Sequence, residues 1–255
     1  MSLPIWMRDA LSSEQKRYEG RGWRLVEAQH QVSTLKLVDT LAEQELLESL
    51  LEETKPSIPL ECRHLDFLLA TPFRYGSAYP RGSRFRAAGM TRGVFYAAEM
   101  VTTALAEMAF HRLLFFAESP ATAWPQDAAE LTAFSCAVAS DQVIDLTQLP
   151  FKSHEDLWSD CADYSGAQSL AEMAREVNVA VLRYSSIRDP DAGFNLALLT
   201  CRAFAEPRPL ERQTWRMRLS ATGVQALCEF PRARIEFSRE AFQSDPRISS
   251  LRWDR

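Results

Sequence analysis

The sequence lacks the residues and spacings that mark several large classes of protein. Its five cysteines are scattered and contain no Cys-x-x-Cys pair, which indicates reduced thiols in a core and argues against a disulfide framework or a zinc site. The four histidines are dispersed, so we expect no metal, which would need three or four ligands. The motifs of serine hydrolases, P-loop NTPases and Rossmann folds are absent.

Long apolar runs and an excess of basic residues are also missing. The longest apolar stretches, such as LALL and LLFFA, are far too short to span a bilayer. The N-terminus MSLPIWMRDALSSEQ has no signal pattern. A formal net charge of -5 argues against broad nucleic-acid binding. We therefore expect a cytoplasmic protein with no membrane segment and no direct nucleic-acid partner.

The 255 residues predict an α+β fold with an N-terminal appendage, because strands and helices do not alternate regularly. Residues 11–55 are expected to be helical, with Asp39 or Thr40 as a cap within them. Prolines 56 and 59 end that helix. We therefore divide the chain into a helical extension, residues 1–60, and a main domain, residues 61–255, with C-terminal strands in 206–240.

The main domain has alternating and buried apolar patterns that predict its elements. Strands are expected at 93–98, 131–139, 142–146, 179–185, 195–204, 213–220 and 233–238. Helices are expected at 102–116, capped by Thr102 or Thr103, and at 154–178 with a break near Gly166. Residues 65–70 form a short apolar stretch before a turn at Pro72.

The segment from Phe73 to Glu107 carries the clearest functional signal. Three of the nine glycines (82, 89 and 93) and four arginines (81, 84, 86 and 92) fall within thirteen residues of this acidic chain. Guanidinium groups match phosphate oxygens in pairs, and glycines allow backbone amides to approach an anion closely. The segment is therefore either an anion site or a solvated loop with surface arginines.

Three features near this loop could contribute chemistry. Glu107 lies on a helix that is apolar nearly all round, so it either lines a cleft or pairs with Arg112 or a loop arginine. Tyr96 is either a core tyrosine or a cleft residue. Ser185 and Ser186 end a strand before a turn, where they either contact a ligand or serve turn geometry.

In order and spacing, these residues resemble the RES domain, a family of toxins from bacterial toxin–antitoxin modules. Members show a Gly-Gly-Arg-Trp/Phe stretch, a strand ending in Tyr-x-Ala, a helix with Thr/Ser-Ala-x-x-Glu, then a Ser-x-Arg strand end and an Asn. The matching residues, spread over roughly 65–205, are Gly82-Ser83-Arg84-Phe85, Tyr96-Ala97-Ala98, Thr103-Ala104-Leu105-Ala106-Glu107, Ser186-Ile187-Arg188 and Asn195.

The resemblance implies an ADP-ribosyltransferase-like fold, with a split, curved sheet and flanking helices around an NAD⁺ cleft. It makes residues 61–255 a RES-like catalytic domain that breaks the nicotinamide–ribose bond, by hydrolysis or phosphorolysis of NAD⁺ or by transfer of ADP-ribose to a protein. NAD⁺ is then a substrate, and no cofactor is bound permanently. The alternative of another class is a nucleotide-binding module without turnover.

The resemblance also assigns residues to roles. Glu107 would stabilise positive charge on the ribose. Arg84 and Arg74 would hold phosphates or ribose, Tyr75 and Tyr96 would pack at the nicotinamide end, and Ser186 and Asn195 would complete the site. Arg84 against Arg86, and Ser186 against Ser185, remain open because Ser83 and Ser185 depart from the family pattern.

The resemblance further implies a cognate antitoxin that covers the cleft in a hetero-oligomer. The N-terminal helices lie outside the resembled core. We expect them to pack on it through Leu35, Val38, Leu41 and Leu46, leaving a polar face that either serves self-association or docking, or has no partner role.

Overall fold

The computed structural model describes residues 4, 6–27, 37–76, 80, 82–249 and 251–254. Its strands are β1 (Lys16–Glu27), β2 (Phe95–Ala98), β3 (Ala129–Asp145), β4 (Val181–Ser185), β5 (Phe194–Leu198), β6 (Glu211–Ser220), β7 (Gly223–Cys228) and β8 (Ala233–Ser238). Its α-helices are α1 (Met7–Ser13), α3 (Leu41–Thr54), α4 (Phe67–Arg74), α5 (Val101–Glu118), α6 (Asp156–Ser159), α7 (Ser165–Glu176) and α8 (Pro246–Ser249). Short 3-10 helices are η1 (Leu60–Cys62), η2 (Phe151–His154), η3 (Cys201–Ala203) and η4 (Arg239–Phe242).

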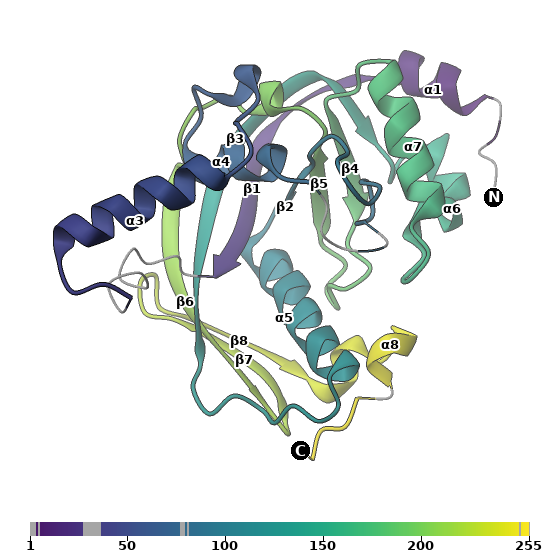
Figure 1. The fold of residues 1–255 in the computed structure, drawn as a ribbon. Helices are drawn as coiled ribbons and strands as arrows, with labels where there is room; N and C mark the ends of the chain where they lie inside the picture. Colours follow the sequence, from purple (N-terminus) through teal and green to yellow (C-terminus); the bar gives the residue numbers. More distant parts are fainter. Residues whose placement is uncertain are drawn as a thin grey trace.

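The described strands form one sheet in the order β1-β2-β5-β4-β3-β6-β7-β8 (Figure 1). Strand β1 also pairs with β3 along most of its length, so β1, β2, β5, β4 and β3 make a closed ring. Strands β6, β7 and β8 continue from β3 as antiparallel neighbours. The fold is α+β, as expected. The expected split sheet is instead one hydrogen-bonded unit, because the 17-residue β3 pairs with both parts.

Alternation of side chains along the strands builds separate cores on the two faces of the sheet. Phe134, Cys136 and Val138 of β3 point into the ring, where they meet side chains from β2, β4 and β5. Leu131 and Ala133 point the other way, toward α5 and strands β6 and β7. A third core packs α1 and α7 on the outer face of β2, β4 and β5.

Helix α5 is central to this arrangement (Figure 1). Residues 103–106 are buried on every side of its first turns, as the apolar sequence predicts, whereas farther along Ala109, Phe110, Leu113 and Phe116 share one buried face and Phe115 is exposed. The helix begins after Met100, which has extended backbone, so the expected caps Thr102 and Thr103 are both wrong. Thr103 is instead buried at the first turn, facing the turn between β4 and β5.

The helical prediction for residues 11–55 is wrong over most of its first half. Residues 16–27 form β1, which completes the ring by pairing with β3. Trp23 and Leu25 are buried and alternate with the half-buried Arg24 and Val26, which is the period-2 pattern of a strand, and the partners of β1 in β3 lie more than a hundred residues away in sequence.

The second half is helical but does not pack as expected. The Thr40 hydroxyl accepts a hydrogen bond from Glu43 N, and the Glu43 carboxylate accepts one from Thr40 N, so the expected cap is confirmed as a capping box. However, none of the residues of α3 is buried, and Leu41 and Leu46 are exposed. The prediction that they pack on the core is therefore wrong. Leu35 lies outside the described residues.

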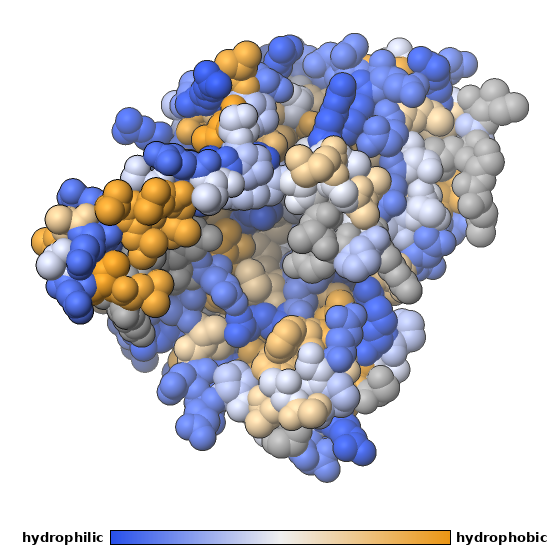
Figure 2. All heavy atoms as spheres, viewed as in Figure 1, coloured by the Kyte–Doolittle hydropathy of each residue, from blue (hydrophilic) through white to orange (hydrophobic). Residues whose placement is uncertain are grey.

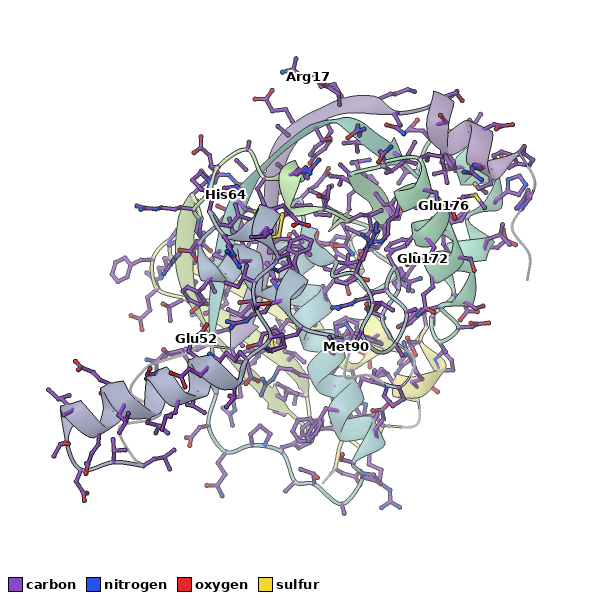
Figure 3. All side chains as sticks on the ribbon, turned by 45° about the horizontal axis from the view of Figure 1, so that its top comes forward. Arg17, Glu52, His64, Met90, Glu172 and Glu176 are labelled. Atoms are coloured by element: carbon purple, nitrogen blue, oxygen red, sulfur yellow. A yellow bond between two sulfur atoms is a disulfide. The ribbon has the colours of Figure 1, made fainter. Side chains whose placement is uncertain are left out.

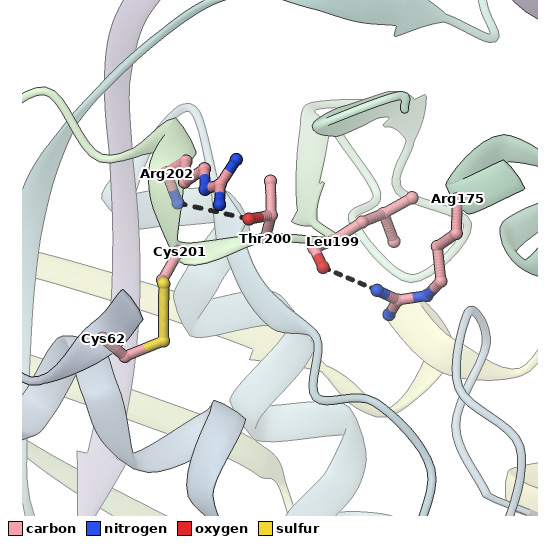
Figure 4. Close-up of a disulfide and its surroundings, with 6 residues drawn as sticks. All are labelled: Cys62, Arg175, Leu199, Thr200, Cys201 and Arg202. Carbon is pink, nitrogen blue, oxygen red and sulfur yellow. Dashed lines mark hydrogen bonds between the residues drawn. A yellow bond between two sulfur atoms is a disulfide. The ribbon is translucent and has the colours of Figure 1, made fainter. Parts of the chain in front are cut away.

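The expectation that all cysteines are reduced is also corrected. Cys62 of η1 and Cys201 of η3 form a disulfide, with Cα atoms 5.9 Å apart (Figure 4). The segments around it are secured further: Thr200 Oγ1 caps η3, and Leu199 O accepts a 2.6 Å hydrogen bond from Arg175. The two cysteines are 139 residues apart, so only the folded chain reveals that they meet.

Other elements follow the sequence with shifted boundaries. The two strands expected at 131–146 are one strand, β3, and the helix expected at 154–178 divides into η2, α6 and α7. Gly166 lies inside the first turn of α7, where a Cβ would stand 2.0 Å from Leu157 O, so glycine is required for the close approach of α6. Strand β7 and helix α4 were not predicted. Within the described ranges, no helix is long and apolar enough to cross a membrane.

Candidate active site

Glu107 lies at the centre of a hydrogen-bond network between α5 and the turn that joins β4 to β5. Its Oε1 accepts bonds from Ser186 Oγ and Asn195 Nδ2, both at 2.7 Å. Its Oε2 accepts a 3.0 Å bond from Arg188 Nη1. Ser186 and Asn195 are buried, whereas the Glu107 side chain is 22% exposed. The predicted residues Glu107, Ser186 and Asn195 are therefore in direct contact.

The β4–β5 turn brings these residues to the helix. Ser186 N donates to Gly193 O at 2.8 Å, and Ser186 Oγ accepts from Asp189 N at 3.1 Å. A Cβ on Gly193 would stand 2.1 Å from Thr103 Oγ1 and 2.5 Å from Asp189 Oδ2. Glycine is thus needed here because the turn lies directly against the first turn of α5.

Arg188 is the functional candidate that the sequence analysis did not name as a site residue. Besides Glu107, it contacts His111 Nε2 at 3.0 Å and donates to Tyr164 Oη at 2.8 Å. Its guanidinium lies over the Phe110 ring, 4.4 Å from the centroid. The signal was present in the sequence, because Arg188 is the arginine of the Ser186-Ile187-Arg188 motif.

The electrostatics of the network keep Glu107 ionised. Burial opposes ionisation, but the Arg188 cation and the hydrogen bonds from Ser186 and Arg188 outweigh it and hold the pKa of Glu107 below its usual range. Burial of part of the His111 ring disfavours its charged form, and the nearby Arg188 cation disfavours it further. Together they lower the pKa of His111 to about 4, although the residue as a whole is exposed. His111 is therefore neutral near pH 7.

Tyr96 holds the glycine- and arginine-rich loop against the sheet. Its hydroxyl lies 2.9 Å from Ser83 Oγ and accepts a 2.9 Å bond from Phe85 N. Burial raises the pKa of Tyr96, so its hydroxyl stays protonated. Gly82 has φ +69°, and a Cβ there would stand 2.1 Å from Arg86 O, so this turn of the loop requires glycine.

Arg84 extends from this loop toward the Glu107 network. It is buried, donates to Trp158 O, and lies over the Tyr164 ring at 5.1 Å from the centroid. Tyr164 in turn accepts from Arg188, so one tyrosine links the two arginines. Among the described residues, Arg84 Nη2 has no hydrogen-bond partner. It borders a cavity of about 10 Å³, which has room for one water.

The geometry separates the alternatives that the sequence left open. Arg86 donates to Thr91 Oγ1 and to the carbonyls of Pro72, Tyr75 and Thr91, so it secures the loop to the end of α4. Arg84 has a free donor and Arg86 is committed to carbonyls, which favours Arg84. Ser186, not Ser185, contacts Glu107; Ser185 lines the small cavity.

Arg74 and Tyr75 lie at the end of α4, outside the Glu107 network. Arg74 Nη1 pairs with Glu52 of α3 at 2.6 Å, and Arg74 Nε donates to Pro56 O. The Arg74 guanidinium lies 5.8 Å from the Tyr75 ring centroid. These contacts join α4 to α3, and no described contact connects them to Glu107. Their assignment to NAD⁺ binding stays a prediction.

The alternative partners foreseen for Glu107 are not the ones it has. Arg112 pairs with Glu27 at 2.7 Å, and the loop residues Arg84 and Arg86 donate to other groups. In the described part of the chain, no three His, Cys, Asp or Glu side chains gather where they could hold a metal ion.

One comparison with known proteins agrees with the motifs. A family model described as the RES domain matches residues 58–220. No curated protein matches the chain. A crystal structure of the M. tuberculosis MbcT–MbcA toxin–antitoxin complex is similar at a TM-score of 0.46 and 12% identity, covering 96% of this chain and 98% of the other.

Proposed function

The chain belongs to the RES domain family, and from this premise we propose that it is an NAD⁺-consuming enzyme that cleaves the bond between nicotinamide and ribose. The observation that supports this best is the Glu107 network. An ionised, partly exposed carboxylate is braced there by Ser186, Asn195 and Arg188.

The chemistry suits this arrangement. Nicotinamide in NAD⁺ is a cationic leaving group, so its departure needs no strong general acid. The sugar left behind develops oxocarbenium character, which a fixed carboxylate stabilises electrostatically. Three donors fix Glu107, so little reorganisation accompanies the reaction. The carboxylate can also accept a hydrogen bond from a ribose hydroxyl and orient the sugar.

The arginines around the network suit a dinucleotide. Arg84, Arg188 and Arg247 all lie at Tyr164, and Arg247 is also paired with Asp245. The Arg84 Nη2 that lacks a partner is buried, so it could bind a phosphate oxygen only if the side chains that cover it move. Because the cavity beside Arg84 holds only about one water, NAD⁺ would approach from the surface, where the Glu107 side chain is 22% exposed.

The test is to incubate purified protein with NAD⁺ and measure free nicotinamide. Parallel reactions contain water only, added phosphate, or a cell lysate with labelled NAD⁺. Release in buffer alone indicates hydrolysis, dependence on phosphate indicates phosphorolysis, and label on a lysate protein indicates ADP-ribosyl transfer. No nicotinamide in any reaction would overturn the proposal.

Two alternatives use the same residues. An ADP-ribosyltransferase would need the same carboxylate but a protein acceptor, which this chain need not encode. A nucleotide-binding module would bind NAD⁺ without turnover, and calorimetric binding without nicotinamide release would identify it. An ionised Glu107 suits both enzymes and the binding module, because its carboxylate can also hold a ribose hydroxyl, so nicotinamide release is the measurement that separates them.

The family membership also supports a toxin role with a cognate antitoxin partner. We expect expression of the chain alone to arrest growth and deplete cellular NAD⁺, and co-expression of an antitoxin from the neighbouring gene to relieve both. Growth without NAD⁺ loss, in cells that contain the folded protein, would exclude the toxin role.

A further inference from the structure

Helix α3 exposes a row of leucines. Leu41, Leu46, Leu50 and Leu51 are 71, 61, 50 and 41% exposed. The helix extends away from the ring of strands (Figure 1), and apolar side chains gather over it in Figure 2. Burial of a leucine side chain is favourable, so a group of leucines left in water is typical of an interaction surface.

The helix holds its shape without a partner. The capping box at Thr40 and Glu43 fixes its start. Near its end, Glu52 pairs with Arg74 of α4, and Figure 3 shows Glu52 at the end that meets the body. Leu46 and Leu50 lie one turn apart on one side of the helix, and Leu51 lies about 100° farther round, one turn after the half-buried Leu47, so these leucines form one broad apolar face. The 14 residues of α3 span about 21 Å, which suits docking of a second helix.

The charge of this helix selects the kind of partner. Residues 39–55 contain six acidic residues and one lysine, a net charge equal to the -5 of the whole chain. Asp39, Glu43, Glu45, Glu52 and Glu53 are exposed. A second copy of the chain would bring two such helices together, and the repulsion of like charges disfavours that pairing. A basic helix would match both the leucines and the carboxylates.

We propose that Leu46, Leu50 and Leu51, the leucine stripe of α3, are the docking surface for a basic amphipathic helix of another protein. Its apolar residues cover the leucine stripe, and its lysines or arginines lie beside Glu45 and Glu53. The proposal rests on α3 alone and does not depend on NAD⁺ chemistry.

The experiment measures binding of two labelled helical peptides of about 18 residues to the full chain by fluorescence anisotropy. Both peptides have the same leucine spacing, one with lysines and one with glutamates at the polar positions. The first variant replaces the leucine stripe with serine. The control variant replaces Leu210 and Leu227 with serine, because each of these leucines is 47% exposed and neither lies on α3. A further variant, Glu45→Gln with Glu53→Gln, removes charge only, and circular dichroism checks that each variant is folded.

We expect the lysine peptide to bind, the glutamate peptide to bind at least about tenfold more weakly, and salt to weaken the lysine peptide. The stripe variant should lose about tenfold or more in affinity, the charge variant less, and the control variant nothing. Equal affinity for both peptides, equal binding by stripe and control variants, or a leucine-dependent homodimer in ultracentrifugation would each overturn the proposal.

Discussion

The structure contains two glutamate–arginine clusters that look alike by simple counts but differ in their donors. Glu99 and Glu107 each accept three hydrogen bonds, and each side chain is 22% exposed. Glu99 is held by Tyr18 and by a two-point fork from Arg183, with contacts of 2.7 and 3.0 Å. Glu107 is held by two neutral donors and a single contact from Arg188.

The number of arginines separates the clusters further. Arg183 also pairs with Asp145 at 3.0 Å, so one cation serves two carboxylates there. Three arginines gather at Tyr164 beside Glu107: Arg84, Arg188 and Arg247, of which Arg247 is also paired with Asp245. Several guanidinium groups in one place suit the phosphates of a dinucleotide better than one arginine shared by two acids. The number of bonds to the acid therefore does not distinguish the clusters, whereas the kind of donor and the number of arginines do.

The largest expected difference is in catalysis. Glu107→Gln should lower nicotinamide release by at least about a hundredfold, because it removes the charge that stabilises the sugar cation. Glu99→Gln should leave kcat of the folded protein within about threefold. Both are measured with melting temperature as the check on folding, and equal losses of kcat would break the comparison.

The opposite difference is expected in stability. Arg183→Gln leaves Glu99 and Asp145 without their shared cation in a site where Arg183 is only 17% exposed. We expect a loss of about 3 kcal/mol in the free energy of unfolding, from urea titration. The control Arg216→Gln removes an exposed pair with Glu130 and should cost less than about 0.5 kcal/mol. A tolerated Arg183→Gln would mean that this cluster is not structural.

The arginine-rich loop gives a further test of the cluster around Glu107. Arg84→Ala should raise the apparent KM for NAD⁺ by about tenfold and also slow the reaction, because a phosphate contact is lost next to Tyr164. Arg92 is exposed, and Arg92→Ala should change neither value. If both substitutions had the same effect, a diffuse attraction of anions to the loop would explain the data better than a specific phosphate contact of Arg84.

Arg188 should set the pH range in which Glu107 is ionised. Its cation helps to hold the pKa of Glu107 low, so Arg188→Gln raises that pKa. The acid limb of the pH–rate profile should then move up by about one pH unit. Arg112 lies on the same helix as Glu107 but pairs with Glu27, so Arg112→Gln should leave the acid limb in place. If the acid limb stayed in place in the Arg188 variant, Arg188 would not set the pKa of the group that controls the rate.

The smallest expected effect concerns His111. Its pKa is about 4 in the folded chain, below the ordinary 6.5, so between these values the unfolded chain binds more protons. The free energy of unfolding should therefore fall as the pH drops from 6.5 to 4, and fall less steeply in His111→Gln. Identical slopes for the two proteins, from urea titrations across this range, would contradict the lowered pKa.

Local patterns predicted much of the fold. Helix α5, the capping box at Thr40 and strands β2, β4, β6 and β8 follow from periodicity and cap chemistry. Strand β1 and the Cys62–Cys201 disulfide did not follow, because each depends on partners more than a hundred residues away. The exposure of α3 could not be predicted either, because its leucine pattern equally suits a helix packed on a core.

For the site, the order of the motifs in the sequence was enough to select Glu107, Ser186 and Asn195 as candidate residues. The sequence also determined the family, since the Tyr, Glu and Ser-x-Arg motifs are local and ordered. Only the tertiary structure decided which arginine pairs with Glu107. Chain spacing cannot give this, because Arg188 is 81 residues away, and the glycine turn against α5 brings the two side chains to 3.0 Å.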